Sequence, residues 1–336
     1  MEQQDKKCIL QVKNLHVHYI TEEEEVYAVN GISFDLQEGD SIGLVGETGA
    51  GKTTTAMAIM QLIPDPPGVI TEGEIYFKGR NMITNSDKEN QKIRGNGISM
   101  IFQDPMTALN PTMTVGDQLV EVLRRHNKGM TKAEAKKRCI ETLEMVGVKE
   151  ERFDDYPHQF SGGMKQRVVI TMALLCNPDL LIADEPTTAL DVTIQAQVLD
   201  IMMDLKKKFN MGLIMITHDL GVVAETCDKV AIVYAGEIVE SGTIEEVYLN
   251  PRHPYTCGLF DSIPKLDEDS TRLVPIEGMT PNMAEPPTGC FFHPRCKYCR
   301  DICKTKSPVM TEGSHRFKCF FPLGNEADEV IEKKGE

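Results

Sequence analysis

Short apolar runs separated by polar turns fill the N-terminal third of the chain, a pattern typical of β-strands. Hydrophobic and polar positions alternate over residues 8–19, which predicts an edge strand, and residues 26–36 and 73–78 predict two more strands. Residues 41–45 (SIGLV) and 98–102 are almost wholly apolar, as expected for strands that are buried on both faces. We therefore expect this part of the chain to be mainly β-structure.

The spacing of apolar residues becomes helical after Gln103. Residues 114–126 place four apolar side chains on one helical face, and Thr131 and Glu134 form the pattern of a capping box that opens a second helix. We expect residues 104 to about 160 to form a helical insertion between strands, which the next predicted helix extends to about residue 176.

Strands and helices alternate in the following segment. Residues 180–183 (LLIA) and 213–216 read as buried strands, Asp191 is placed to cap a helix between them, and residues 229–241 read as a hairpin.

The length of 336 residues suggests two domains, or one large domain with an appendage, and an apolar content of 41% is enough for a sizeable core. We expect a main domain over residues 1–250. Residues 251–323 are rich in proline, cysteine and turns and predict a small appended domain, whereas residues 324–336 form a charged tail that we expect to be disordered.

The net charge of −15 disfavours nonspecific binding to nucleic acid. No apolar run approaches the 18 or so residues of a bilayer-spanning helix, and the polar first residues do not resemble a signal peptide. We therefore expect the protein to stay in the cytoplasm.

Residues 46–53 (GETGAGKT) match the phosphate-binding loop of a nucleotide-binding protein, and they lie between a predicted strand and a predicted helix. Glycines let successive backbone N–H groups surround phosphate oxygens, and the helix N-terminus favours their negative charge. Lys52 is expected to reach the β- and γ-phosphates of ATP, and the Thr53 hydroxyl to bind Mg²⁺. The expected ATP-binding residues of this segment are Gly46, Glu47, Thr48, Gly49, Ala50, Gly51, Lys52, Thr53 and Thr54.

Two carboxylates follow the buried strand at residues 180–183. Asp184 is placed to hold Mg²⁺, and Glu185 to orient or deprotonate an attacking water molecule. The pair alone would also suit the N-terminus of the next helix. The preceding phosphate-binding loop favours the catalytic interpretation.

Residues 160–167 (FSGGMKQR) resemble the signature motif of the ATPase subunits of ABC transporters. The resemblance implies a P-loop NTPase (RecA-like) α/β core with an N-terminal antiparallel β subdomain, an inserted α-helical subdomain and a small cysteine-rich C-terminal domain. It implies that Gln103 senses Mg²⁺ and the γ-phosphate, that His218 contacts the γ-phosphate, and that Asp191 belongs to the D-loop. An upstream aromatic residue should stack on adenine; Tyr19 is our choice and Tyr27 the alternative.

The resemblance also implies an assembly. Ser161, Gly162 and Gly163, with Gln166, would bind the ATP of a second ABC ATPase, either a paralogue or a second copy of this chain. Two transmembrane permease subunits, and indirectly an extracytoplasmic peptide-binding protein, would complete the transporter. The ATPase would then lie at the cytoplasmic face of the cell membrane.

Residues 253–256 (HPYT) and 262–264 (SIP) resemble the ATPases of oligopeptide and dipeptide importers, as do residues 107–111 (TALNP) and 287–290 (PTGC). Nickel importer ATPases are close relatives and remain an alternative. A soluble ABC protein acting on ribosomes or DNA is a third interpretation. The chain lacks the paired ATPase domains or long coiled coil usual in that class, and its net charge argues against it.

Five of the ten cysteines crowd into residues 290–319, which in a reducing compartment favours a metal over disulfides. Cys290, Cys296, Cys303 and Cys319 resemble the pattern associated with a [4Fe–4S] cluster in peptide importers. Cys299 is an addition to that pattern, and the resulting Cys296-x-x-Cys299 pair keeps a zinc site open as an alternative, with free thiols as a further one.

Overall fold

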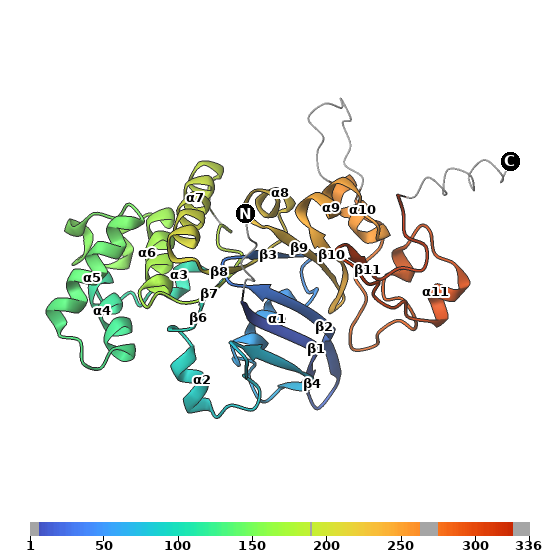
Figure 1. The fold of residues 1–336 in the computed structure, drawn as a ribbon, viewed down its shortest axis with the longest axis horizontal. Helices are drawn as coiled ribbons and strands as arrows, with labels where there is room; N and C mark the ends of the chain where they lie inside the picture. The colour runs from blue at the N-terminus through green and yellow to red at the C-terminus, as the bar shows by residue number, and fades with distance from the viewer. Residues whose placement is uncertain (1–6, 189, 263–274, 325–336) are drawn as a thin grey trace.

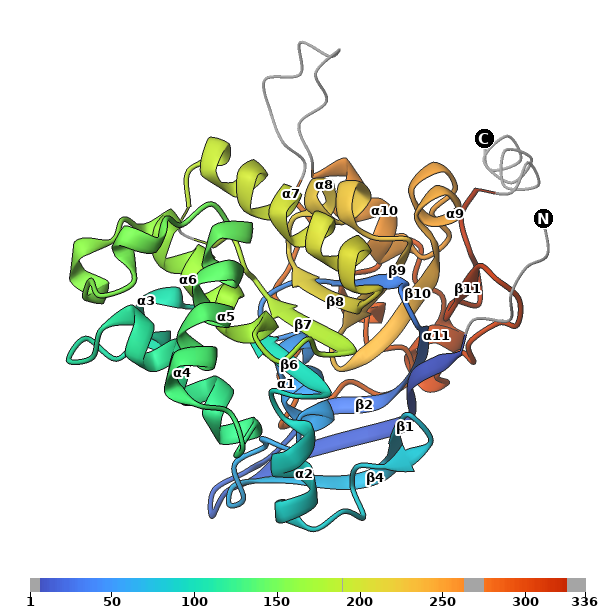
Figure 2. The same ribbon diagram turned by 60° about the vertical axis from the view of Figure 1, so that its left-hand side comes forward.

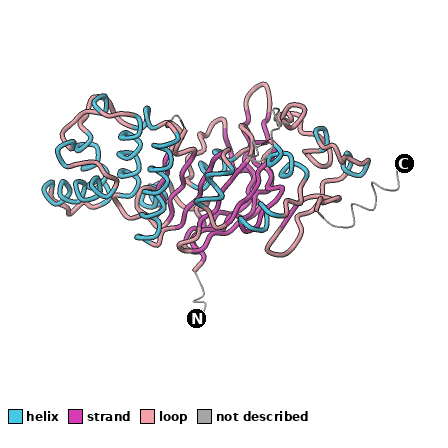
Figure 3. Tube along the Cα trace, turned by 90° about the horizontal axis from the view of Figure 1, so that it is seen from above, coloured by secondary structure: helices cyan, strands magenta, loops and turns pink. Residues whose placement is uncertain are grey.

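The computed structural model describes residues 7–188, 190–262 and 275–324. Two sheets form the centre of the molecule, with helices gathered at one end and loops at the other (Figures 1 and 3). Residues 325–336 of the predicted tail, like residues 263 and 264 of the SIP motif, lie outside the described residues. None of the described helices is long and apolar enough to cross a membrane.

The larger sheet has the order β11-β10-β9-β3-β8-β7-β6. Neighbouring strands run parallel from β6 to β9, whereas β9, β10 and β11 pair antiparallel. All residues of β3, β7 and β8 are buried, which explains their almost wholly apolar sequences. The strands are β3 (Ser41–Val45), β6 (Ile98–Ile101), β7 (Leu180–Asp184), β8 (Gly212–Thr217), β9 (Lys229–Tyr234), β10 (Glu237–Thr243) and β11 (Arg316–Phe317).

The smaller sheet is antiparallel, with the order β2-β1-β4-β5. Its strands are β1 (Cys8–Ile20), β2 (Glu25–Gln37), β4 (Gly68–Phe77) and β5 (Arg80–Asn81). The expectation of an edge strand at residues 8–19 was wrong, because β1 pairs with both β2 and β4. Helix α1 (Lys52–Ile59) shares one buried cluster with this sheet and with one face of the larger sheet. Helices α7 (Val192–Phe209) and α8 (Leu220–Thr226) lie on the other face (Figure 2).

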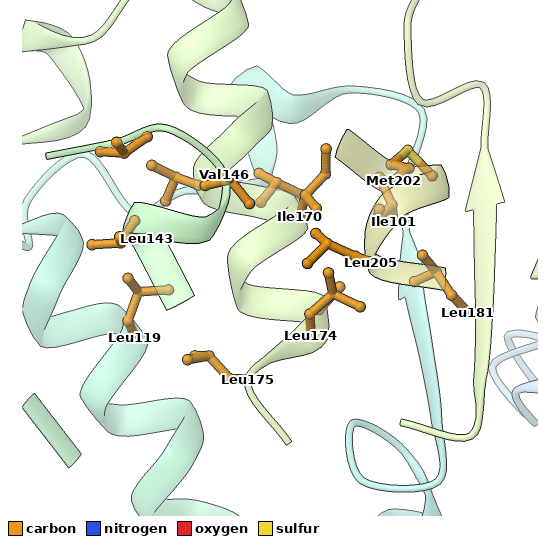
Figure 4. Close-up of a cluster of buried hydrophobic side chains, with 14 of the residues drawn as sticks. Ile101, Leu119, Leu143, Val146, Ile170, Leu174, Leu175, Leu181, Met202 and Leu205 are labelled. Atoms are coloured by element: carbon orange, nitrogen blue, oxygen red, sulfur yellow. The ribbon is translucent and has the colours of Figure 1, made fainter. Parts of the chain in front are cut away.

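The helical insertion is present and packs against that second face. Apolar side chains of α4, α5, α6 and α7 point toward one another and toward β7 in one buried cluster (Figure 4). Thr131 and Glu134 form the predicted capping box at the start of α5. The helices between β5 and β9 are α2 (Asp87–Ile93), α3 (Pro105–Ala108), α4 (Val115–His126), α5 (Lys132–Met145), α6 (Gly162–Leu174), α7 (Val192–Phe209) and α8 (Leu220–Thr226), with 3-10 turns η1 (Glu150–Arg152) and η2 (Pro157–Gln159).

The C-terminal segment packs directly on the larger sheet. Strand β11 adds to its edge by pairing with β10, and Phe292 shares a buried cluster with Tyr234 of β9 and Tyr255. The segment thus shares the core of the preceding domain. Helix α9 (Ile244–Leu249) precedes the segment, whose described helices are α10 (Pro254–Asp261), the 3-10 turn η3 (His293–Arg295) and α11 (Asp301–Thr305).

Candidate nucleotide-binding site

The phosphate-binding loop connects the end of β3 to the start of α1 and passes close to neighbouring backbone. A Cβ atom on Gly46 would lie 2.1 Å from the Val233 carbonyl oxygen, and one on Gly51 would lie 2.4 Å from the Ala28 carbonyl oxygen. Gly51 also has a φ of 95°, which favours glycine. The path of the loop therefore leaves no room for a side chain at these two glycines.

Lys52 is buried under its own loop. Its Nζ donates hydrogen bonds to the carbonyl oxygens of Gly46 at 2.7 Å and Glu47 at 2.9 Å. Burial lowers the pKa of Lys52, and the nearby carboxylates of Glu185 and Asp184 oppose that shift. The amine therefore lies beside two carbonyls of its own loop and near two acidic side chains.

Asp184 ends β7, two strands away from β3 in the parallel part of the sheet. Its side chain is buried and hydrogen-bonded to Thr53 at the start of α1. Burial raises the pKa of Asp184, and the hydrogen bond from Thr53 opposes the rise. A hydroxyl and a carboxylate side by side are oxygen ligands of the kind that Mg²⁺ prefers, so this donor set fits the expected metal.

Three polar side chains surround the Glu185 carboxylate. Gln103 Nε2 and Thr188 Oγ1 each donate to Oε2 at 2.9 Å, and His218 Nδ1 lies 3.1 Å from Oε1. Burial alone would raise the pKa of Glu185, but the bonds to His218, Thr188 and Gln103 hold it below its usual value. The structure thus brings together the three predicted catalytic residues, which follow the ends of β6, β7 and β8. It adds Thr188, which sequence reasoning missed.

The signature segment forms the N-terminus of α6. Ser161 caps the helix by accepting from the Met164 N–H, and a Cβ on Gly163 would lie 2.5 Å from the Ile194 side chain. Gln166 is fully buried and its amide donates to the Pro186 carbonyl, so it links α6 to the loop after Glu185. A contact of this segment with a partner's ATP remains a prediction.

Asp191, the expected D-loop residue, caps α7 as predicted: its side chain accepts a hydrogen bond from the Ile194 N–H at 3.0 Å.

Both candidate adenine-stacking residues lie in the antiparallel sheet. Tyr19 of β1 pairs across the sheet with Gly68, and Tyr27 of β2 contacts His18 edge to face with ring centroids 4.6 Å apart. The carbonyl of the residue after Tyr27, Ala28, borders the phosphate-binding loop at Gly51. Tyr19, with Tyr27 as the alternative, remains a prediction.

The four cysteines that resemble a cluster-binding set line one pocket together with aromatic residues, and Cys299 is not among its lining residues. Burial raises the pKa of Cys296 to about 11 and that of Cys319 to about 12. Within the described residues, no three His, Cys, Asp or Glu side chains are arranged as a metal-holding group. The choice and number of donors nevertheless suit an iron–sulfur cluster or zinc.

Comparison with known proteins identifies the family. Residues 29–188 match the family model described as ABC transporter. The dipeptide transport ATP-binding protein DppD of Bacillus subtilis is 51% identical over 316 residues, covering 93% of this chain and 94% of the relative. The chain belongs to the ABC transporter family. Residues 239–303 of this ABC protein also match the model described as oligopeptide/dipeptide transporter, C-terminal region.

A second relative and a solved structure are also similar to this chain. The oligopeptide transport ATP-binding protein OppD of Salmonella typhimurium is 47% identical over 323 residues, covering 95% of this chain and 96% of the relative. The ATP-binding cassette MJ0796, solved as a dimer in a post-hydrolysis state bound to ADP and Pi, aligns with 70% of this chain and 99% of its own at a TM-score of 0.63 and 28% identity. Its likeness supports the predicted ABC ATPase fold: an α/β P-loop core with an antiparallel β subdomain.

Proposed function

We propose that this ABC protein hydrolyses ATP and thereby energises the import of di- or oligopeptides through a membrane transporter. The observation that carries the ATPase proposal is the convergence of Gln103, Thr188 and His218 on the Glu185 carboxylate. The C-terminal match and the names of the relatives support the peptide substrate. They do not favour the nickel importer, nor a protein acting on ribosomes or DNA.

We assign separate tasks to the residues of this site. The loop's N–H groups and Lys52 bind the β- and γ-phosphates, and Thr53, Asp184 and Gln103 would hold Mg²⁺, which supplies charge stabilisation at the phosphates. Glu185, whose pKa is held low, is ionised at neutral pH and accepts a proton from the attacking water molecule. His218 and Gln103 orient that carboxylate and are placed to contact the γ-phosphate.

The signature segment extends the proposal to a dimer. Its Ser161 hydroxyl and the N–H groups of Gly162 and Gly163 lie at a helix N-terminus, which suits an anion. We place the ATP of a second ATPase subunit there, as a paralogue or a second copy of this chain. The dimeric state of MJ0796 supports this assembly. Two permease subunits and, indirectly, an extracytoplasmic peptide-binding protein complete it at the cytoplasmic face of the cell membrane.

Residues 251–323 form, in this proposal, a C-terminal domain of the peptide-importer type with a [4Fe–4S] cluster. Four thiolates are the usual ligand set of such a cluster, and Cys290, Cys296, Cys303 and Cys319 border one pocket. Zinc is the alternative occupant. The bound cluster or zinc ion would join a segment poor in apolar residues to the edge of the larger sheet.

Glu185→Gln tests the ATPase proposal. The amide keeps the size of the side chain and removes the proton acceptor, so hydrolysis should fall by roughly 10²–10⁴-fold while ATP still binds. ATP that is bound but not hydrolysed should then hold two ATPase subunits together. Light scattering should detect this state as an ATP-dependent dimer. Glu151→Gln, at an exposed position of the helical insertion, is the matched control and should hydrolyse ATP normally. Unchanged hydrolysis in Glu185→Gln would overturn the assignment.

The peptide substrate is tested in proteoliposomes that contain the permease subunits purified with this chain. Uptake of a labelled di- or oligopeptide should require ATP and should be lost with Glu185→Gln. ATP-dependent uptake of nickel without uptake of peptide would instead support the nickel importer.

A further inference from the structure

The second residue of the phosphate-binding loop, Glu47, is held by the C-terminal segment. Arg295 donates to its carboxylate twice, from Nη1 to Oε2 at 2.8 Å and from Nη2 to Oε1 at 3.1 Å. The backbone N–H of Glu47 donates to the Tyr255 hydroxyl at 3.0 Å. Tyr255 and Arg295, each more than 200 residues after Glu47 in the sequence, therefore fix this residue of the ATP-binding loop. Paired, charge-assisted bonds of this kind set direction as well as distance.

Arg295 is itself firmly placed. Its side chain is only 6% exposed, and its guanidinium also donates to the carbonyls of Glu277 at 3.2 Å and Ile276 at 3.3 Å. Beside it, the rings of Tyr234 and Tyr255 pack with centroids 4.6 Å apart, and both tyrosines are fully buried. The guanidinium is therefore a rigid cation at the edge of the loop rather than a mobile surface charge.

A carboxylate in this loop is electrostatically unfavourable for ATP. The loop has to receive a triphosphate, and an unpaired negative charge on Glu47 would repel it. The Glu47 carbonyl also accepts a hydrogen bond from Lys52 Nζ at 2.9 Å, so the residue held by the C-terminal segment in turn contacts the lysine expected to bind the phosphates. Neutralising and fixing Glu47 therefore serves both the charge and the shape of the loop.

We propose that Arg295 is a positioning residue for nucleotide binding: by pairing with Glu47 it removes a repulsive charge from the phosphate-binding loop and couples the C-terminal segment to ATP affinity. The proposal rests on the proposed function only in taking a nucleoside triphosphate as the ligand. It gives the C-terminal segment a task at the ATP site in addition to the proposed metal site at its cysteines.

A double-mutant cycle tests the charge argument. Equilibrium binding of MgATP to the purified full chain should weaken roughly 10-fold in Arg295→Met, because the Glu47 carboxylate loses its partner. Glu47→Gln combined with Arg295→Met should restore affinity to within about threefold of wild type, because the repulsive charge is gone. Loss of affinity in Arg295→Met should be larger for ATP than for ADP and absent for adenosine, since it follows the charge of the ligand.

Other variants separate positioning from general destabilisation. Arg295→Lys keeps the charge and should lose less affinity than Arg295→Met, and the turnover number at saturating ATP should stay within about twofold of wild type in both. Arg300→Met is the matched control, because Arg300 belongs to the same segment but stacks on Phe321, with its Cζ 4.0 Å from the ring centroid. Its ATP affinity should be that of wild type.

If Arg295→Met does not fold, Glu47→Gln alone still decides the matter. It removes the repulsive charge, so it should bind ATP at least as tightly as wild type, and a tenfold loss would overturn the proposal. Equal weakness of the double variant and Arg295→Met would also overturn it. Failure of wild type to bind ATP would instead refute the proposed function itself.

Discussion

Glu185 has an unusual backbone conformation for a residue with a side chain. Its φ of 46° lies in the left-handed region, where a residue with a Cβ atom is strained by about 1–3 kcal/mol. The structure maintains this conformation through the Glu185 N–H, which donates to the Ile216 carbonyl of β8 at 2.8 Å, and through three side-chain contacts with its carboxylate. Such strain is typical of residues whose direction matters for function.

Thr188→Val tests whether the direction of that carboxylate matters. The substitution keeps the shape of the side chain and removes one of the hydrogen bonds that fix Glu185. Without this hydrogen bond the activation free energy of ATP hydrolysis should rise by about 1 kcal/mol. The turnover number should therefore fall about fivefold, with little change in ATP affinity. Steady-state kinetics together with equilibrium binding measure the two effects separately.

Thr188→Ser is the matched control, since it retains the hydroxyl and should remain close to wild type. A Val variant that hydrolyses ATP as fast as the Ser variant would show that Gln103 and His218 orient Glu185 without Thr188.

Local sequence predicted the site residues that lie in motifs, but not those that reach the site from elsewhere. Asp184 and Glu185 follow an apolar strand, and parallel strands end at one edge of a sheet, so their meeting with the phosphate-binding loop could be anticipated. Thr188 lies close in sequence, but only the turn after Glu185 brings its hydroxyl to the carboxylate. Arg295 lies 248 residues from Glu47, and no periodicity connects the two.

Among the helices and strands, those with capping signals or uniform burial were predicted closely. Helix α5 begins after the capping box at Thr131, and β7 and β8 lie where apolar runs predicted buried strands. The position of β1 within its sheet was predicted wrongly. Alternation reports that one face of a strand is buried, but it does not report how many strands pair with its two edges.

A buried lysine joins α7 to the larger sheet. Lys206 Nζ donates to Ser41 Oγ at 2.8 Å on β3 and to Asp228 Oδ2 at 3.1 Å just before β9. Burial alone would raise the pKa of Asp228, but hydrogen bonds from Ser41 and Lys206 lower it below its ordinary value of 3.8. This network lies at the start of the strand that leads into the phosphate-binding loop.

The network predicts a component of acid sensitivity. A carboxyl group whose pKa is lower in the folded state stabilises the fold above its unfolded pKa, and this contribution is lost as pH falls through the folded value. The urea midpoint of wild type should therefore decrease more steeply below about pH 4 than that of Asp228→Asn, which lacks the titrating group. At pH 7 the Asn variant should be the less stable protein. Urea unfolding followed by circular dichroism across this pH range measures both effects.

Asp204→Asn serves as the control, because Asp204 is an exposed carboxylate on the same helix, α7. It should keep the pH dependence of wild type. Parallel pH profiles for wild type and Asp228→Asn would show that the network contributes nothing to acid sensitivity.

For the protein as a whole, the least predictable feature was how the C-terminal segment is attached. Its low apolar content indicated a small appendage without a large core, yet Phe292 packs with Tyr234 and Tyr255 in a cluster that also contains residues of β3 and α8. Strand β11 is too short to be recognised from alternation and exists because β10 offers an edge to pair with. These features depend on tertiary contacts, which composition does not encode.

The cysteine pocket adds a prediction about metal content and stability. Iron and acid-labile sulfide should be present in protein purified without oxygen, together with a visible absorption band, and Cys303→Ser should lose both because Cys303 lines the pocket. Cys299→Ser is the matched control and should retain them, because Cys299 is not among the residues that line the pocket. The Cys303 variant should also unfold at a lower temperature than the Cys299 variant, since a metal that binds only the folded state stabilises it. Stoichiometric zinc without iron would assign the pocket to the alternative metal, and loss of iron from Cys299→Ser alone would contradict the proposed ligand set.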